Sequence, residues 1–296
     1  MRGLIAVRVG SLMLLAGCGD DSAGSDAAGS GAEVPAVAAF YPLAEAAVRV
    51  GGDHVDVTNL TSAGAEPHDL ELTTGQVDAI EDAAVVFVMG DDFQPAVEDA
   101  AERRADNTVV VLDALDVVDD DPHVWLDPVF MAELVEVVLS GLETADPGSD
   151  VVAEFRDNAD AYVAELEALD DAYVSGLANC ARTTMVTAHD AFGYLAARYG
   201  LTVEAIAGIS PDEEPNPDRL AELSDLVEEE GVTTIFTEEL VSPEIAETLA
   251  REAGGLRTAV LNPLEGLTDE QVDAGDDYIS VMEDNLAELR EALGCS

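Results

Sequence analysis

Residues 149–177, SDVVAEFRDNADAYVAELEALDDAYVSGL, form the longest helical pattern in the chain. Apolar side chains recur there at spacings of three and four, with no Gly or Pro between Val151 and Val174. A helix of this length measures roughly 42 Å at a rise of 1.5 Å per residue. We predict a single helix that crosses once between two parts of the molecule. A coiled-coil dimerisation arm is the alternative, because the apolar stripe lasts about four heptads.

Short apolar runs of the kind that form buried parallel strands lie on both sides of this helix. Four precede it, namely VPAVAAFY (34–41), VDVTNL (55–60), AAVVFVMG (83–90) and TVVVLDAL (108–115). Four follow it, namely TTMVTAHD (183–190), LTVEAIAG (201–208), VTTIFTEE (232–239) and RTAVLNPL (257–264). Helical segments separate successive runs, as they do in βα units.

The fold class that follows is α/β, with two lobes that each contain a mainly parallel sheet and flanking helices. We assign residues 36–147 to the N-terminal lobe, 148–178 to the linking helix and 179–296 to the C-terminal lobe. In open α/β sheets, ligands bind in the crevice outside the carboxyl ends of the strands. A site formed by both lobes is therefore expected in the cleft between them.

Three of the four histidines lie in segments that follow predicted strands. They are His68 in AEPHDLE, His123 in DPHVWLDP and His189 in VTAHDAFGYL. Imidazoles from separate loops can converge on one zinc ion or a similar metal, although each histidine alone could be an ordinary loop residue. His54 differs, because it lies at a predicted strand start with its ring toward solvent.

Several polar residues near these segments are further candidates. Glu238 ends the run TTIFTE and Asn262 ends TAVLN, so both point toward the same cleft. Asp127 precedes a helix predicted to begin at Pro128, where it would cap that helix or orient an imidazole.

The N-terminus reads as a lipoprotein signal peptide over residues 1–17. Arg2 and Arg8 flank a short apolar stretch, and the run LMLLAGC places small residues before Cys18. Cleavage before Cys18 would let its sulfur and amine be acylated. Residues 18–35, rich in Gly, Ser, Ala and Asp, then form a flexible tether. We expect an exported protein anchored by lipid at the outer face of the cell membrane, with an ordinary signal peptide as the alternative.

Cys180 and Cys295 remain after acylation of Cys18, an even pair in an oxidising compartment. We predict a disulfide between them, with two free or metal-binding thiols as the alternative. The chain carries 63 Asp and Glu against 12 basic residues, a net charge of −51. Such a charge excludes nucleic acid and anionic membrane surfaces as partners. An acid-rich surface for solubility explains it better than metal capture.

Six motifs in order resemble the metal-binding receptors of bacterial ABC importers for zinc and manganese. The first extends from AAFYPLAEAAVRVGG to VVFVMG, and the others are DPHVWLDP, TAHDAFGYLAARYGL, GISPDEEPNP, IFTEELVSPEIAETLAREAG and LNPLEGLTDEQVDAGDDYISVMEDNLAEL. The resemblance covers the chain from about Ala36 to the C-terminus. It implies two lobes on a long backbone helix with little lobe motion, metal between them, and an ABC permease and its ATPase as partners.

The resemblance also assigns ligands. His68, His123 and His189 match the family's first three ligand positions, and a histidine at the third position is typical of zinc receptors. Three neutral imidazoles favour Zn²⁺ as the transported solute, with Mn²⁺ or iron as the alternative. Where many relatives carry Asp at the fourth position, this chain has Asn262. We rank Asn262 or water first as the fourth ligand, followed by Glu238 and Glu66.

Two of these candidates have a second role open to them. Glu238 could instead hydrogen-bond to a metal-binding histidine and hold its ring in place, as could Glu66. The segment between the first two ligands lacks the histidine-rich loop of many zinc receptors and has only an acidic run, Asp119 to Asp121, best explained as a solvated turn.

The function predicted is capture of zinc by a monomeric receptor and its delivery to an importer, without catalysis. A zinc hydrolase is a rival class, but the chain contains no HExxH motif and no nucleophile elbow. A surface adhesin is another alternative, since adhesion would use exterior residues that the sequence does not mark.

Overall fold

The computed structural model describes residues 33–104, 107–115, 117, 121–145, 147–211, 213 and 216–296. The predicted signal peptide, most of the tether and Cys18 lie outside these residues, as do Asp119 and Asp120. Within the described residues the chain forms two four-stranded sheets, one on each side of a long helix in the sequence.

The N-terminal sheet has the strand order β2-β1-β3-β4, and every pairing is parallel. Its strands are β1 (Val34–Ala38), β2 (Val55–Asn59), β3 (Val85–Val88) and β4 (Thr108–Val110). The central strand β3 is buried at every position, which explains its continuous apolar run. β1 begins two residues before the predicted lobe boundary at 36, because Val34 pairs with Val55 and is buried.

The C-terminal sheet repeats this topology with the order β6-β5-β7-β8, again with parallel pairings. Its strands are β5 (Thr184–Thr187), β6 (Thr202–Ala205), β7 (Thr234–Thr237) and β8 (Arg257–Val260). All eight strands fall inside the predicted apolar runs.

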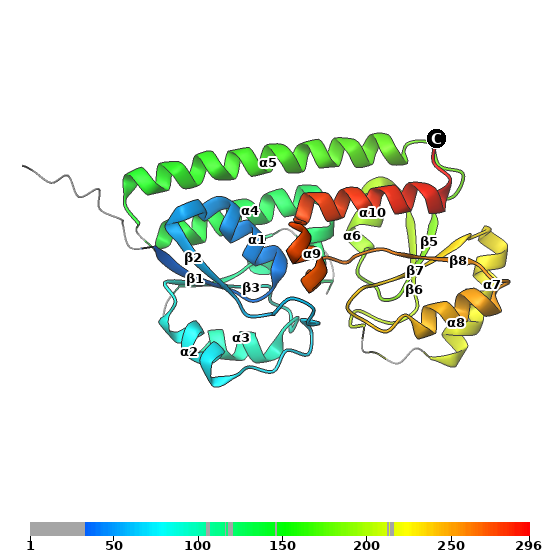
Figure 1. Cartoon of the computed structure of the whole chain (residues 1–296), viewed down its shortest axis with the longest axis horizontal. Helices are drawn as coiled ribbons and strands as arrows, with labels where there is room; N and C mark the ends of the chain where they lie inside the picture. The colour runs from blue at the N-terminus through cyan, green and yellow to red at the C-terminus, as the bar shows by residue number, and fades with distance from the viewer. Residues whose placement is uncertain are drawn as a thin grey trace, which may run out of the picture. The chain divides into compact units, whose positions relative to one another are not determined.

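Helices cover both faces of each sheet (Figure 1). In the N-terminal lobe, α1 (Tyr41–Gly51) and α4 (Pro128–Thr144) lie on one face, and α2 (Thr74–Asp82) and α3 (Pro95–Ala101) lie on the other. In the C-terminal lobe, α6 (Gly193–Tyr199) and α10 (Tyr278–Leu293) lie opposite α7 (Pro217–Glu230) and α8 (Glu244–Glu252). The short helix α9 (Asp269–Ala274) precedes α10.

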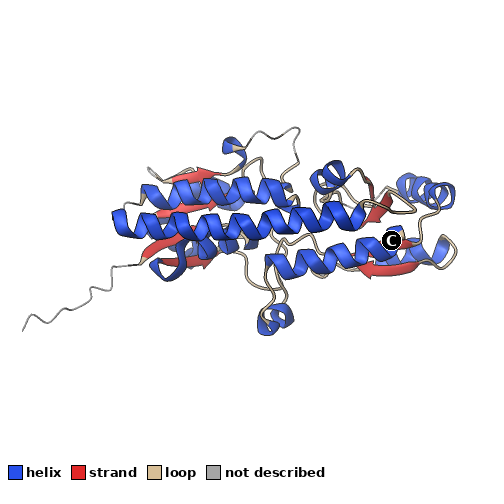
Figure 2. Ribbon diagram, turned by 90° about the horizontal axis from the view of Figure 1, so that it is seen from above, coloured by secondary structure: helices blue, strands red, loops and turns tan. Residues whose placement is uncertain are grey.

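The long helix α5 spans Ser149–Leu177, the same residues as the predicted helical pattern. It contacts α1 and α4 of the N-terminal lobe and α6 and α10 of the C-terminal lobe. Figure 2 shows it running between α4 and α10. Its buried side chains are Phe155, Ala159, Tyr162, Leu166, Leu169, Tyr173 and Leu177. The predicted α/β fold with two lobes joined by one long helix is thus confirmed.

A disulfide joins Cys180, just after α5, to Cys295, just after α10. The predicted pairing is confirmed. Because the bridge spans 115 residues of sequence, it stabilises by roughly 4 to 5 kcal/mol in the chain-entropy model. Close by in the same helix pair, the Tyr173 hydroxyl donates a hydrogen bond of 2.7 Å to the Met282 carbonyl. These two links hold α10 against α5.

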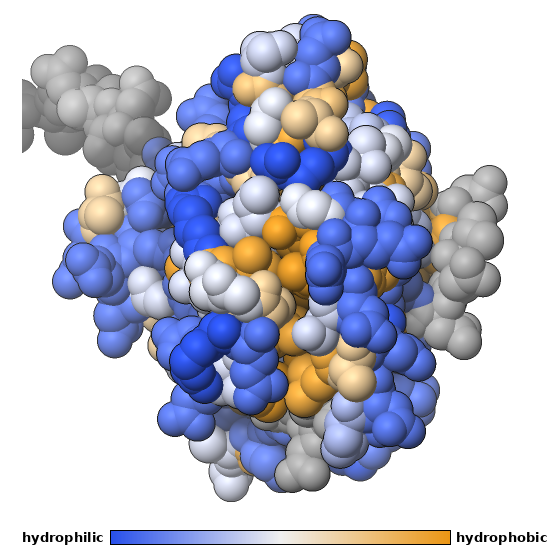
Figure 3. Space-filling view, turned by 90° about the vertical axis from the view of Figure 1, so that its right-hand side faces the viewer, coloured by the Kyte–Doolittle hydropathy of each residue, from blue (hydrophilic) through white to orange (hydrophobic). Residues whose placement is uncertain are grey.

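The exterior is mainly hydrophilic. On the face shown in Figure 3, hydrophilic residues predominate and apolar ones gather in a central strip. In the described part of the chain, the large apolar side chains that are exposed are Val48, Val174, Ile245, Val260 and Val272. None of the described helices combines the length and hydropathy needed to cross a bilayer.

A partly exposed ionic cluster forms where α1 meets α5 and the start of α10. The Arg49 guanidinium lies 4.2 Å from the centre of the Tyr162 ring, and it pairs with Glu45 at 3.8 Å. Asp277 and Glu165 also pair with Arg49. Burial raises the pKa of Glu45 from 4.5 to about 7; Arg49 opposes this shift, and Asp277 and Glu165 reinforce it.

This raised pKa predicts a pH-dependent stability. Folded Glu45 holds its proton more tightly than unfolded Glu45, so the associated stability is lost as pH rises from 4.5 to about 7. As pH rises from 4.5 to 8, the free energy of unfolding of Glu45→Gln should therefore increase by roughly 1 to 3 kcal/mol relative to that of the unaltered protein. Urea unfolding at a series of pH values measures this difference. Glu167→Gln, an exposed site on α5, is the control, and equal pH profiles for both variants would contradict the assignment.

Candidate metal centre

Four side chains converge from loops that follow strands of both sheets. His68 lies in the loop after β2, and His123 lies between β4 and the 3-10 helix η3 (Val124–Leu126). From the C-terminal lobe come His189, just after β5, and Glu265, in the loop after β8. In the described residues, they form the one group of His, Cys, Asp or Glu that could share an ion, with donor atoms within 4.8 Å of one another.

One carboxylate oxygen lies within hydrogen-bond distance of all three imidazoles in this group. Glu265 Oε1 is 3.1 Å from the Nε2 atom of His68, 3.3 Å from that of His123 and 3.1 Å from that of His189. Ligands about 2.1 Å from a tetrahedral ion are about 3.4 Å apart, so these separations suit four ligands of one metal ion. The structure thus brings the three predicted histidines together around a fourth group.

Two further carboxylates fix the imidazole rings from behind. The Nδ1 atom of His123 lies 2.7 Å from Asp121, and Nδ1 of His189 lies 2.8 Å from Glu238. Each carboxylate also accepts the backbone N–H of the same histidine, at 3.0 and 3.2 Å. A proton on each Nδ1 therefore leaves Nε2 free to act as a ligand, the tautomer that metal-binding histidines require.

Because this centre is buried, its charged groups interact strongly with one another and shift each other's pKa. Among the described acidic residues, only Asp127, Glu238 and Glu265 are buried. Burial alone would raise the pKa of Glu265, but hydrogen bonds from the three imidazoles hold it well below its usual value. Burial opposes protonation of His189, yet Glu238 and Glu265 raise its pKa to about 10. The buried carboxylates therefore favour positive charge at the position of the rings, which a divalent cation can supply.

His68 is held differently from the other two histidines. Its ring packs edge to face on Phe93, with centroids 4.5 Å apart. The Glu66 carboxylate accepts the backbone N–H groups of His68 at 3.0 Å and of Asp69 at 3.3 Å. Glu66 therefore fixes the loop that carries His68, and these bonds leave it outside the group of four.

A cavity of about 320 Å³ borders the centre on the side of the C-terminal lobe. Its wall includes Glu66 and Glu238, which hold two of the histidine segments, and apolar residues such as Leu240 and Val241. The centre is thus buried between the lobes but lies next to a space that carries carboxylates.

The other predicted site residues lie outside the group of four and support the segments around it. Asn262, ranked first for the fourth ligand, uses its side-chain oxygen to accept the Leu264 N–H at 2.7 Å, which shapes the loop that carries Glu265. Glu238 lies on the far side of the His189 ring from Nε2, in its alternative role of holding a histidine. Asp127 caps α4 by accepting the Val129 N–H at 2.9 Å.

Asp127 has a second partner, Arg198 on α6, which pairs with the same carboxylate oxygen across the lobes. It is Asp121 rather than Asp127 that orients the neighbouring imidazole. His54 lies in the 3-10 helix η1 (Gly52–His54) and pairs with Glu154 of α5 at 2.8 Å, away from the centre.

Sequence reasoning missed two residues of the centre. Glu265 was not among the candidates for the fourth ligand, although it lies in the motif LNPLEGL, three residues after Asn262. The sequence alone predicts that Asp121 belongs to a solvated acidic turn, whereas the structure places its carboxylate against His123. Its position two residues before His123 was the available signal, since a carboxylate at that spacing can reach the same imidazole.

Comparison with known families gives a match to the model described as ZnuA, zinc-uptake complex component A periplasmic, over residues 36–292. The chain belongs to the ZnuA family. Members of this family are solute-binding receptors. The match begins near the first strand and ends in α10, so both lobes of the described structure are included.

Individual relatives agree with this ZnuA-family assignment. The zinc-binding lipoprotein AdcA of Streptococcus pneumoniae is 38% identical over 277 residues, which cover 86% of this chain and 55% of AdcA. The chain therefore spans about half the length of that relative. The high-affinity zinc uptake system protein ZnuA of Bacillus subtilis is 33% identical, covering 95% of this chain and 94% of the relative.

Solved structures show the same ZnuA-type fold. The crystal structure of the Zn(II)-bound ZnuA-like domain of Streptococcus pneumoniae AdcA has a TM-score of 0.75 and 39% identity, covering 88% of this chain and 99% of that domain. The laminin-binding protein Lmb of Streptococcus agalactiae, described as having adhesin and metal transporting activity, has a TM-score of 0.79 and 32% identity, covering 87% of this chain and 98% of Lmb.

The contact between Asp121 and His123 can be tested by removing one charge. Asp121→Asn should lower zinc affinity by roughly 10- to 100-fold, because the imidazole loses the carboxylate that fixes its tautomer. Competition against a chromogenic chelator measures the affinity. Asp99→Asn removes the same charge from an exposed position of the same lobe and should leave the affinity unchanged. An effect of equal size in both variants would show that net charge, not ring orientation, matters.

Proposed function

We propose that this protein captures Zn²⁺ outside the cytoplasm and delivers it to an ABC importer. The observation that carries the proposal is the convergence of three Nε2 atoms on Glu265 Oε1, from loops of both lobes. Three neutral imidazoles and one carboxylate suit Zn²⁺, whereas harder Mn²⁺ prefers more oxygen ligands. Relatives named for zinc binding and zinc uptake support the same cargo.

The donor set supports a receptor rather than an enzyme. Catalytic zinc sites provide three protein ligands and keep one position open for water or substrate. Here four protein side chains are close enough to fill a tetrahedral sphere, and three of them are fully or almost fully buried. A sphere filled by protein side chains leaves no position for water or substrate, which supports zinc as the cargo of the site.

Delivery requires that this closed centre be disturbed. The two lobes each supply two of the four donors, so any displacement of one lobe against the other separates ligands. We infer that docking of both lobes on a membrane permease, powered by its ATPase, distorts the centre and releases zinc. Membership of the ZnuA family supports such partners.

The proposal also includes a lipid anchor and a monomeric state. Cys18 would carry the lipid that anchors the receptor at the outer face of the membrane, and a relative named as a lipoprotein supports this. A monomer is favoured over a coiled-coil dimer because the apolar side of α5 already packs on α1, α4 and α10 of its own chain.

Metal competition tests the proposed cargo. Chelator-stripped protein with Cys18→Ser, offered equal amounts of zinc, manganese and iron, should bind one zinc per chain. His189→Ala and Glu265→Gln should each lower zinc affinity by more than about 100-fold, since loss of a ligand exceeds loss of its orienting partner. Circular dichroism would establish that both variants remain folded. His54→Ala is the control and should bind zinc normally.

Three results would change this account. A preference for manganese would overturn the choice of cargo, and full affinity in His189→Ala would overturn the ligand assignment. Absence of stoichiometric metal from the unaltered protein would favour an adhesin or a receptor for another solute.

Lipid anchoring is tested separately in cells. Cys18→Ser should move the protein from the membrane fraction to the soluble exported fraction, because acylation needs the Cys18 sulfur. Incorporation of labelled palmitate reports the modification directly. Ser22→Ala, four residues later, is the control and should remain with the membrane. Retention of Cys18→Ser in the membrane fraction would exclude the proposed anchor.

A further inference from the structure

Trp125, the single tryptophan of the chain, connects the two lobes beside the metal centre. It is fully buried and lies two residues after His123 in the N-terminal lobe. Its indole Nε1 donates a hydrogen bond of 2.8 Å to the carbonyl of Pro263 in the C-terminal lobe. Pro263 is two residues before Glu265. One side chain thus joins the segment of one ligand to the segment of another.

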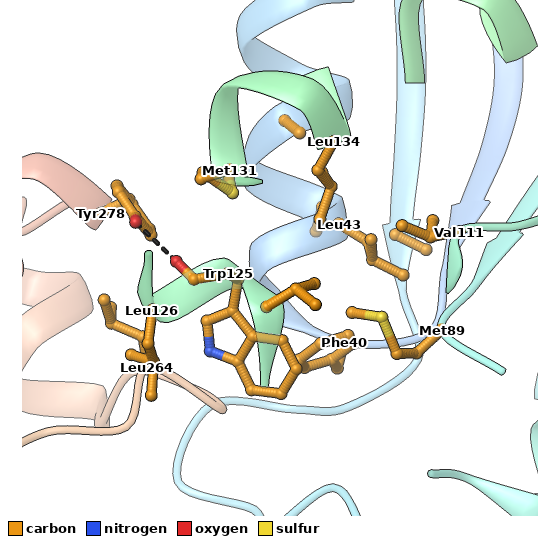
Figure 4. Packing of buried hydrophobic residues seen from close by; sticks show 14 of the residues in the cluster. Phe40, Leu43, Met89, Val111, Trp125, Leu126, Met131, Leu134, Leu264 and Tyr278 are labelled. Atoms are coloured by element: carbon orange, nitrogen blue, oxygen red, sulfur yellow. Dashed lines mark hydrogen bonds between the residues drawn. The ribbon is translucent and has the colours of Figure 1, made fainter. Parts of the chain in front are cut away.

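The indole is itself held in place from the N-terminal lobe and from α10. Its ring packs on Phe40, Phe93 and His123, with centroids 4.8, 5.5 and 5.1 Å apart. The Trp125 carbonyl accepts a hydrogen bond of 2.6 Å from the hydroxyl of Tyr278 (Figure 4). The donor Nε1 therefore has a fixed position from which to hold the Glu265 loop.

The Glu265 loop has a conformation that needs such support. Leu264 has a φ of +55°, in the left-handed region that is unfavourable for residues that carry a Cβ atom. The Asn262 side chain accepts the Leu264 N–H at 2.7 Å. The backbone N–H of Asn262 in turn donates to the Asn285 side-chain oxygen at 2.8 Å. These bonds hold the loop only to its own lobe. Figure 4 shows Leu264 beside Trp125, in the same apolar cluster.

We propose that the hydrogen bond from Trp125 to Pro263 positions Glu265 against the three histidines and thereby sets zinc affinity. Trp125 is a positioning residue, because it acts through Glu265 and does not touch the ion. Without this bond, the loop keeps its other link to the N-terminal lobe, the 2.8 Å bond from the Gly64 N–H to the Leu267 carbonyl. The segment before Glu265 loses its tie, however, and Glu265 Oε1 shifts away from the three Nε2 atoms. This inference rests on the proposed function, since it concerns the affinity of the same centre.

A double-mutant cycle separates action through Glu265 from a general effect on the fold. Trp125→Phe removes the donor and keeps an aromatic ring. It should lower zinc affinity roughly tenfold in the unaltered background, the size usual for an outer partner of a ligand. In the Glu265→Gln background it should change affinity by less than about twofold, because the ligand that it positions is already altered.

Tyr173→Phe is the matched control for loss of a buried hydrogen bond. Its hydroxyl donates to the Met282 carbonyl at 2.7 Å, within the α5 and α10 pair, and among the described residues it makes no hydrogen bond to the Glu265 loop. This variant should lose stability while keeping its zinc affinity. Visible absorption of the Co²⁺-loaded proteins gives a second readout, because it reports the ligand set and not stability. Trp125→Phe should shift this spectrum toward that of Glu265→Gln, and Tyr173→Phe should not.

Incorporation of benzothienylalanine at position 125 covers the case in which Trp125→Phe fails to fold. This residue keeps the bicyclic shape but has sulfur in place of N–H, so it should reproduce the loss of affinity. An equal loss in both backgrounds, or an unaltered affinity with either substitution, would overturn the inference. Those results leave zinc binding by the unaltered protein intact, whereas failure of the proposed function would appear as absence of zinc from that protein.

Discussion

The shared position of one carboxylate oxygen is the constraint on which the rest of the structure depends. Glu265 Oε1 lies within 3.3 Å of three imidazole nitrogens, two from the N-terminal lobe and one from its own lobe. A buried carboxylate needs compensating positive charge, and a buried cluster of imidazoles needs acceptors. Glu265 and the three imidazoles satisfy each other only while the two lobes keep a fixed position relative to one another. The centre therefore demands a rigid frame, and its buried carboxylates make that frame selective for cations.

The frame is built from helix contacts rather than from the sheets. The helix α5 packs on α1 and α4 in one lobe and on α6 and α10 in the other. The Cys180–Cys295 disulfide and the bond from Tyr173 to Met282 hold α10 against α5. From the start of α10, Tyr278 reaches back to Trp125 in the N-terminal lobe. A single continuous set of contacts thus leads from the backbone helix to the residues beside the ligands.

The sequence predicted the frame and the three histidines that converge between the lobes because those features have strong local signals. A helix without Gly or Pro, apolar runs of strand length and histidines after strands are all visible without tertiary information. Glu265 gave no such signal. Its position is set by the loop after β8, where Leu264 adopts a positive φ and Asn262 turns the backbone by accepting its N–H. Because of that loop, the carboxylate that meets the histidines is Glu265, three residues after Asn262, which the strand end had indicated.

Asp121 shows the same limit in another form. In a chain with 63 acidic residues, one carboxylate beside a histidine does not stand out from a solvated turn. Its role becomes evident only when its oxygen is seen 2.7 Å from His123 Nδ1, with Tyr194 of α6 donating to its backbone carbonyl. Composition therefore obscures this contact, and tertiary structure is needed to distinguish one functional carboxylate from the many that face solvent.

The most direct test of the account is a crystal structure of the zinc-loaded protein with anomalous data at the zinc edge. We expect one strong peak between the lobes, bound by the Nε2 atoms of His68, His123 and His189 and by an oxygen of Glu265. Asp121 and Glu238 should keep their contacts with the Nδ1 atoms. A peak bound by Asn262 or Glu238 in place of Glu265, or a peak elsewhere in the chain, would show that Glu265 and the three histidines do not form the zinc site.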